Sequence, residues 1–321
     1  MSDNGSTTET APSERDILQR LAFESLREQK RARRWSIFFK AFFALYLLAV
    51  LVLVQLDAVT EIKGDHTALV DLEGVIQADG NVNADTVVSG LRQAFKSKHS
   101  KGVILRINSP GGSPVQSDYI NREIHRLRSE YPNKPMYSVV TDIAASGGYY
   151  VAAASEKIYA NQSSIVGSIG VLMDGFGFVD TLKKLGVERR LLVSGKYKGM
   201  LDPFSPLKEV EKGHAQLLLE QVHEQFIEAV QRGRGDRLVD NEDLYSGLFW
   251  TGLQAKELGL IDEFGSASQI ARDVFGAKEI VEYTVKPNFF DRFAEQLGMG
   301  MAKIFSSTLH LEGAGRNFEL R

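Results

Sequence analysis

Apolar residues are concentrated in one early stretch of the chain. Residues 1–34 are polar, whereas 37–56 is apolar except for Lys40 and Gln55 and contains the unbroken run AFFALYLLAVLVLV at 41–54. About 20 mostly apolar residues suffice to cross a bilayer as a helix, and Lys40 is near enough to one end to reach the headgroups. The pattern predicts a polar tail at 1–34 and a transmembrane helix at 35–56. The alternative is a buried core helix, which would normally show a polar face.

Charges on either side of this stretch predict its orientation. Asp57 and Glu61 follow it with only Lys63 nearby, while five basic residues precede it: Arg27, Lys30, Arg31, Arg33 and Arg34. Basic residues flanking a span favour the cytoplasmic side. We therefore expect a cytoplasmic N-terminus and an external remainder. The exit at Leu56-Asp57-Ala58 is a poor cleavage site for a signal peptide, which favours an uncleaved anchor.

From about Thr67 onward, short β-type runs alternate with helical periodicity. Strands are expected at 67–72, 102–107, 136–141, 157–160 and 190–194. Helical patterns are expected around 87–95, from Ser113-Pro114 onward, over 149–154 and over 207–232, the last with Leu218, Val222, Phe226, Ile227 and Val230 as its buried stripe. This alternation predicts an α/β domain with a largely parallel sheet at 57–285. Residues 286–321 are expected to form an amphipathic tail.

Composition excludes several kinds of function. The net charge of −3 over 321 residues gives no reason to expect a nucleic-acid partner. There is no cysteine, which excludes disulfides and thiolate chemistry, and the six histidines lack the spacing of zinc ligands. No metal or organic cofactor is expected.

Two glycine-containing segments each follow a predicted strand. Asn108-Ser109-Pro110-Gly111-Gly112-Ser113 can turn sharply and leave backbone N–H groups accessible beside a helix start. The alternative is a βα turn in which the glycines serve geometry only. In Ala144-Ala145-Ser146-Gly147-Gly148, a serine at a strand-to-helix junction exposes its hydroxyl, and the next N–H can face a developing oxyanion. The alternative for Ser146 is a simple helix N-cap.

A third segment, Ser194-Gly195-Lys196-Tyr197-Lys198, offers a base. Lysine can activate a serine hydroxyl when desolvation lowers its pKa. Spacing does not separate Lys196 from Lys198, because residues i and i+2 share one face of a strand. Surface lysines on a loop are the alternative.

Five ordered blocks together resemble the S49 family, the signal peptide peptidase A type of serine peptidase. They are RINSPGGS (106–113), AASGGYY (144–150), VGSIGV (166–171), SGKYKGMLDPFSP (194–206) and WTGLQAKELGLIDEFG (250–265). The resemblance implies Ser146 as nucleophile and Lys198, rather than Lys196, as general base. It further implies that Ser168 orients the lysine and that the N–H of Gly147 and of Gly111 or Gly112 form an oxyanion hole.

The resemblance also implies the fold and the setting. The expected fold is that of the ClpP and crotonase superfamily, a spiral of ββα units, preceded by one transmembrane helix. It implies a single-pass protein of the bacterial inner membrane whose catalytic domain is periplasmic, which degrades cleaved signal peptides and other membrane-derived peptides, and which forms a homo-oligomer.

Two other functions fit parts of the pattern. A non-catalytic membrane scaffold that binds peptides or partner proteins would not need Ser146 and Lys198, both of which are present. Acyl-CoA chemistry on the same fold is disfavoured by the expected external location, since CoA is a cytoplasmic cofactor.

Overall fold

A computed structural model describes residues 14–57 and 64–285 of the chain. The amphipathic tail expected at 286–321 lies outside the described residues, as do residues 1–13. The chain divides into two compact units, Met1–Lys63 and Gly64–Arg321. The first is helical and the second is an α/β unit.

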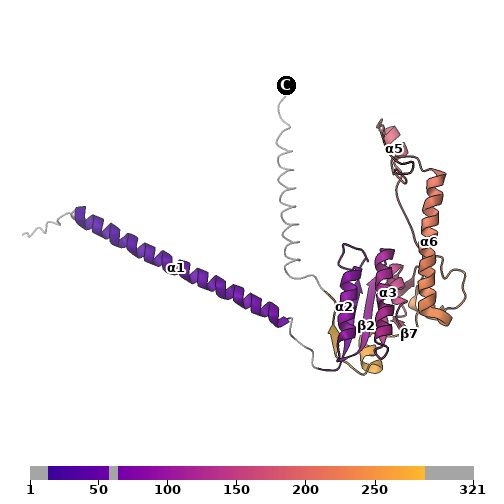
Figure 1. Ribbon diagram of the computed structural model, residues 1–321, viewed down its shortest axis with the longest axis horizontal. Helices are drawn as coiled ribbons and strands as arrows, with labels where there is room; N and C mark the ends of the chain where they lie inside the picture. The colour runs from indigo at the N-terminus through magenta and orange to yellow at the C-terminus, as the bar shows by residue number, and fades with distance from the viewer. Residues whose placement is uncertain (1–13, 58–63, 286–321) are drawn as a thin grey trace, which may run out of the picture. The chain divides into compact units, whose positions relative to one another are not determined.

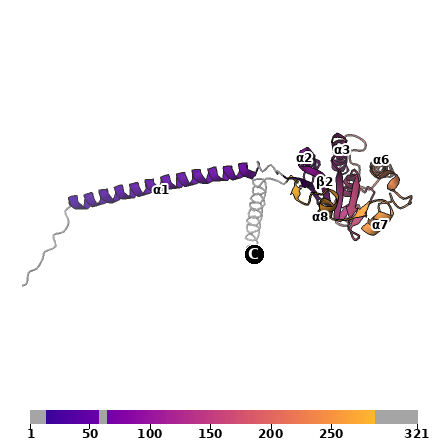
Figure 2. The same cartoon turned by 90° about the horizontal axis from the view of Figure 1, so that it is seen from below.

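In its described residues, the first unit contains one helix, α1 (Glu14–Asp57) (Figure 1 and Figure 2). The boundary predicted at 34/35 falls inside this continuous helix. Across the residues that the structure describes, no helix combines the length and the apolar character needed to cross a membrane. The span at 35–56 stays a prediction.

The second unit alternates strands with helices, as the sequence predicted. Its first half contains β1 (His66–Glu73), α2 (Ala84–Lys96), β2 (Ser100–Ser109), α3 (Pro114–Glu130), β3 (Met136–Ala145), α4 (Gly147–Ala152), β4 (Lys157–Ala160) and β5 (Ile165–Gly167). Its second half contains α5 (Val179–Lys184), α6 (Glu209–Arg234), η1 (Gly235–Arg237), β6 (Phe249–Thr251), α7 (Gly252–Glu257), β7 (Glu263–Phe264), α8 (Ala267–Gln269), η2 (Ile270–Val274) and β8 (Ile280–Glu282).

The strands form one sheet in the order β6-β5-β3-β2-β1-β8, with β4 and β7 off this path. All neighbours run parallel except β5 and β6, which are antiparallel. The central strands are apolar on both faces, as expected where helices cover both sides of a parallel sheet. A mixed α/β unit with a central sheet fits the expected ClpP-like fold.

The sheet forks along β3. Residues 137–139 of this strand pair with β4, whereas residues 143–145 pair with β5 along the same edge. β4 continues the sheet to β7, and β5 continues it to β6. Because of this fork, the C-terminal end of β3, which leads into Ser146, lies beside β5 rather than beside β4.

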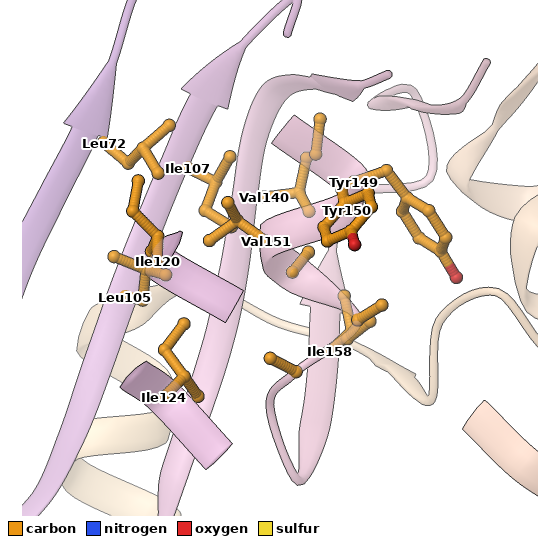
Figure 3. Close-up of a cluster of buried hydrophobic side chains, with 14 of the residues drawn as sticks. Leu72, Leu105, Ile107, Ile120, Ile124, Val140, Tyr149, Tyr150, Val151 and Ile158 are labelled. Carbon is orange, nitrogen blue, oxygen red and sulfur yellow. The ribbon is translucent and has the colours of Figure 1, made fainter. Parts of the chain in front are cut away.

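The main core lies between the sheet and the helices α2, α3 and α4. Ile120 and Ile124 of α3 lie over Leu105 and Ile107 of β2, and all four are fully buried (Figure 3). α3 begins as predicted, with Ser113 as N-cap accepting a hydrogen bond from the N–H of Gln116 and with Pro114 in the first turn. The opposite face carries a smaller cluster under α8 and η2, formed by Leu69, Ile104, Val139, Tyr159 and Ile270.

The C-terminal half of α6 is anchored in the body of the domain. Arg234, at the end of this helix, is fully buried, donates to the carboxylate of Asp262 at 2.7 Å and also donates to the carbonyl of Gly259. Asp262 also accepts from the N–H of Ile158 in β4. The WTGLQAKELGLIDEFG block thus contributes the partner of a buried arginine.

Residues 170–222, here called the arm, project from this body. They contain α5 and the N-terminal half of α6, and Figure 1 shows α5 at the end of α6 that lies away from the sheet. The strand predicted at 190–194 is wrong: these residues are exposed and have no strand partner to complete a ladder. Of the stripe predicted for 207–232, Phe226 and Val230 are buried, and Val222 and Ile227 are half-buried. Leu218 is exposed, because that half of the helix belongs to the arm.

Candidate active site

Three of the singled-out segments meet at one edge of the sheet. β2, β3 and β5 are adjacent and parallel, and their final residues are in register: Ser109 pairs with Ala144, and Ala145 pairs with Gly167. Carboxyl ends of neighbouring parallel strands lie together, which is where α/β proteins usually bind ligands. The loops after these strands begin near Pro110, at Ser146 and at Ser168, so the topology brings together residues that are as far apart in the sequence as Pro110 and Ser168.

Ser146 adopts a backbone conformation that is unusual for a residue with a side chain. Its φ is 51° and its ψ is −123°, a region that costs about 1–3 kcal/mol and recurs at functional sites. The residue is half-buried and stands at the N-cap position of α4, yet its hydroxyl makes no capping hydrogen bond. The hydroxyl is therefore not used as a cap, which was the alternative interpretation of this serine.

Backbone hydrogen bonds hold this conformation on both sides. The N–H of Ser146 donates to the carbonyl of Gly167 at 2.8 Å, and the carbonyl of Ser146 accepts from Tyr150 at 2.9 Å. The first bond ties the serine to β5, and the second begins α4. The first bond depends on the pairing of β5 with the C-terminal end of β3.

Gly111 and Gly112 allow the neighbouring loop to approach Ser146 closely. Gly111 has φ of 103°, and a Cβ there would lie 2.7 Å from both the Cβ of Ser146 and the backbone nitrogen of Gly147. Gly112 has φ of 144°, and a Cβ there would lie 2.1 Å from the carbonyl oxygen of Ile76. Both positions exclude any side chain, so the glycines serve close approach as well as turn geometry.

The backbone N–H groups of this loop differ in availability. That of Gly111 donates to the hydroxyl of Ser109 at 3.1 Å. Within the described parts of the chain, the N–H groups of Gly112 and Gly147 have no hydrogen-bond acceptor. They are also close together, because a Cβ on Gly147 would lie 3.3 Å from the nitrogen of Gly112. Two free donors beside Ser146 match the requirement of an oxyanion hole.

Ser168 follows β5 at the same edge. Its φ is 52°, and its N–H donates to the carbonyl of Leu248 at 2.7 Å. Among the described residues, only Ser146, Ser168 and Leu201 combine a side chain with positive φ. Two of these three are residues singled out from the sequence, which supports a shared functional origin of the strain.

Lys198 and Lys196 lie elsewhere, on the arm. Both are exposed, Lys198 follows a turn closed by its own N–H to Gly195, and the amine of Lys196 lies 5.1 Å from the centre of the Tyr197 ring. In the portion of the chain described by the structure, no hydrogen bond joins either lysine to Ser146 or Ser168. The structure brings together the serine, the glycines and Ser168, and leaves the candidate base on the arm.

Two other polar side chains near the site make hydrogen bonds that hold the surrounding elements. The phenol of Tyr150 donates to Asp118 at 3.0 Å, and burial raises the pKa of Tyr150 to about 12. Asn121, fully buried on α3, donates to the carbonyl of Tyr150 at 2.7 Å and so holds α4. In the ranges 14–57 and 64–285, no group of three or more histidines or carboxylates is arranged to hold a metal ion.

Sequence inspection missed several supporting residues. The hydroxyl of Ser109 donates to Gly74 while accepting from Gly111, and the hydroxyl of Ser117 donates to the carbonyl of Ser113. Ser109 lies within the SPGG segment, so its position was a usable signal. For Asn121 the signal was weaker: it is a polar residue one helical turn from the buried Ile124.

Comparisons with known proteins point to a family of peptidases. The model of peptidase family S49 matches residues 128–280, a range that includes Ser146, Ser168 and Lys198 but not the Gly111 loop. A putative signal peptide peptidase SppA of Enterococcus faecium is 32% identical over 203 residues, which is 63% of this chain and 58% of that protein. Protease 4 of Haemophilus influenzae is 35% identical over 207 residues, 63% of this chain and 33% of that protein.

A differently named relative is more similar in sequence. The Na(+)/H(+) antiporter NhaA of Brucella melitensis is 44% identical over 215 residues, 65% of this chain but only 29% of that protein. Most of the sequence of that antiporter lies outside the region that matches this chain. This chain spans less than two thirds of the length of each of these three relatives.

Proposed function

Because the chain belongs to peptidase family S49, we propose that it is a serine endopeptidase in which Ser146 is the nucleophile and Lys198 the general base. The observation that carries this proposal is the strained Ser146, whose hydroxyl makes no capping bond and beside which two backbone N–H groups have no acceptor. The proteases named among its relatives support the same reaction class. The fold would be the ClpP and crotonase type.

The proposed chemistry proceeds in two halves. Ser146 Oγ attacks the peptide carbonyl carbon while its proton passes to the neutral amine of Lys198, and the N–H groups of Gly147 and Gly112 stabilise the oxyanion. Collapse of the tetrahedral intermediate breaks the C–N bond, and the leaving amine takes the proton from Lys198. Water then attacks the ester carbonyl while Lys198 accepts its proton. The acyl C–Oγ bond breaks, Lys198 returns the proton to Ser146 Oγ, and the carboxylic acid product leaves.

Gly112 is favoured over Gly111 as the second donor. The N–H of Gly111 already donates to Ser109, whereas that of Gly112 is free in the described structure. In this arrangement Ser109 shapes the loop and Gly112 contacts the oxyanion. Ser168 is assigned the orientation of the lysine amine.

The position of Lys198 supports a homo-oligomer. A lysine acts as a base when it is removed from water, yet Lys198 is exposed on the arm of a single chain. A second copy that covers the arm would desolvate it. We therefore propose that the protein forms a homo-oligomer in which a second copy covers the arm.

The proposed location is the bacterial inner membrane, with residues 35–56 in the bilayer and the catalytic unit on the periplasmic side. The apolar run at 41–54 and the basic residues before it support this topology. Peptides left in the membrane, such as cleaved signal peptides, would be the substrates.

The full chain, in detergent or in its own membranes, provides the test. A serine-reactive fluorophosphonate should label the wild type, and a fluorogenic apolar peptide should be cleaved. Both signals should vanish in Ser146→Ala and fall by about 10³-fold or more in Lys198→Ala. Lys196→Ala is the matched control, because it removes an exposed lysine from the same turn.

Each outcome tests a different part of the proposed function. If labelling and cleavage are lost in Lys196→Ala but retained in Lys198→Ala, the general base is Lys196 rather than Lys198. A wild type that neither labels nor cleaves in any preparation would refute the peptidase and favour a non-catalytic, peptide-binding membrane scaffold.

A further inference from the structure

One side-chain hydrogen bond closes the base of the arm. The chain leaves the body of the domain after Ile169 and re-enters it along α6, where the ring Nε2 of His223 lies 3.1 Å from the carbonyl oxygen of Ile169. A carbonyl can only accept, so Nε2 must carry the hydrogen and donate. Among the described residues, no other hydrogen bond joins α6 to residues 165–171.

His223 lies on the half of α6 that packs against the body of the domain. His223 is partly buried and shares the core-facing stripe of α6 with Phe226 and Val230, at spacings of three and seven residues. Phe226 is buried with its ring centre 5.0 Å from that of Tyr150, and Val230 is fully buried. Preceding residues of α6 are mostly exposed, so His223 is the last anchor before this helix enters the arm.

The accepting carbonyl belongs to the loop at the active site. Ile169 is fully buried and directly follows Ser168, which has positive φ and donates its N–H to Leu248. The preceding residue, Gly167, accepts the N–H of Ser146. A continuous path of backbone and hydrogen bonds therefore runs from His223 through residues 169, 168 and 167 to the nucleophile.

We propose that His223 is a positioning residue, which fixes the loop of residues 167–170 and the base of the arm relative to Ser146. This inference rests on the proposed peptidase function for its kinetic consequence. Without the hydrogen bond, the loop would lose its tie to α6, and both Ser168 and the arm that carries Lys198 would adopt a wider range of positions. The histidine itself takes no part in proton transfer.

His223→Leu removes the donor and keeps an apolar side chain of similar size. His223→Gln retains an amide nitrogen near the position of Nε2 and serves as the conservative rescue. His214→Leu is the matched control, because it removes an exposed histidine from the same helix. All variants are made in the full chain, and circular dichroism melting checks that each is folded.

Hydrogen–deuterium exchange gives a readout independent of activity. Peptides covering residues 165–171 should exchange about five- to tenfold faster in His223→Leu, the effect expected from one lost neutral hydrogen bond, and at the wild-type rate in His223→Gln and His214→Leu. Unchanged exchange in His223→Leu would overturn the proposal.

Kinetics of the same variants test the link to the active site. His223→Leu should lower the fluorophosphonate labelling rate and kcat by about tenfold with KM changed less than about twofold, because reactive geometry rather than peptide binding is disturbed. His223→Gln should restore most of both. Faster exchange with wild-type labelling would overturn the role in positioning. If the wild type itself is unreactive, the peptidase proposal fails while the exchange data still decide whether His223 fixes the loop.

Discussion

At the scale of single residues, the site depends on backbone conformations that most side chains avoid. Ser146 and Ser168 both have positive φ, at 51° and 52°. Each is held by its own N–H, which donates to Gly167 in the first case and to Leu248 in the second. The strain, about 1–3 kcal/mol at each position, is offset by these bonds and by the packing of the strands that supply the acceptors. The result is a serine hydroxyl that makes no capping bond.

The contact between the two loops predicts the effect of a single methyl group. In Gly111→Ala the new Cβ would lie 2.7 Å from the Cβ of Ser146, at a φ of 103° that alanine avoids. The loop must move away from the nucleophile, so the fluorophosphonate labelling rate should fall about tenfold or more. Gly177→Ala is the control, because no atom lies within 4 Å of its new methyl group. Labelling of Gly111→Ala at the wild-type rate would contradict the close approach.

At the scale of elements, α6 is divided between two environments. Its C-terminal half buries Phe226 and Val230 and ends on the buried Arg234, whereas its N-terminal half belongs to the arm. A cavity of about 660 Å³ on the arm is lined by residues from both this half and the preceding segment, including Met173, Leu191 and Ala215. One helix thus connects the anchored body with the part that carries the candidate base.

The ion pair that anchors α6 should make stability depend on pH. Arg234 and the Ile158 N–H hold the pKa of Asp262 below its ordinary value, although burial opposes them. A carboxyl whose folded pKa lies below its unfolded value of about 3.9 stabilises the fold fully above that value. This contribution is lost as the pH falls through the lower, folded pKa.

Asp262→Asn tests this dependence. The variant should lose about 3–5 kcal/mol at pH 7, because Arg234 would stay buried without a charged partner. Its melting temperature should also fall less than that of the wild type between about pH 5 and pH 3. Thermal melts of both proteins over this range measure the difference. Parallel pH curves for the two proteins would show that another carboxyl dominates acid unfolding.

At the scale of the whole molecule, the arm exposes an unusual amount of apolar surface. Leu192 is 96% exposed and Phe176 79% exposed, and Leu172 and Leu185 are similarly open. Large apolar patches on soluble surfaces commonly mark contacts with other proteins or copies. The same segment contains the candidate lysine, so covering the arm would also remove Lys198 from water.

Leu192→Glu should therefore weaken self-association. A carboxylate buried at an apolar interface costs several kcal/mol, so the dissociation constant should rise about 100-fold or more. Light scattering of the full chain in detergent, with concentration varied, measures the change. Leu253→Glu, which alters a half-exposed leucine on α7, should associate normally. Equal association of Leu192→Glu and the wild type would place the contact elsewhere.

The sequence by itself determined the repeating pattern of the second unit and the candidate residues. Apolar runs at 67–72, 102–107 and 136–141 predicted β1 to β3, because central strands of a parallel sheet must be apolar on both faces. Ser113-Pro114 predicted the start of α3, because capping and a fixed φ act locally. The ordered blocks indicated Ser146, Ser168 and the glycines as site candidates, because a nucleophilic hydroxyl or a tight backbone turn requires a particular residue type.

Only the tertiary structure decided which of these residues meet. The register of β2, β3 and β5 brings the glycine loops and Ser168 to one edge, and register depends on pairings between distant segments. The segment 190–194 has strand composition but lies exposed on the arm without a partner, and a strand requires one. His223 lies within the helical pattern predicted at 207–232, and only the fold places the carbonyl of Ile169 beside it. Periodicity describes the faces of an element, whereas contacts such as these depend on the packing of one element against another.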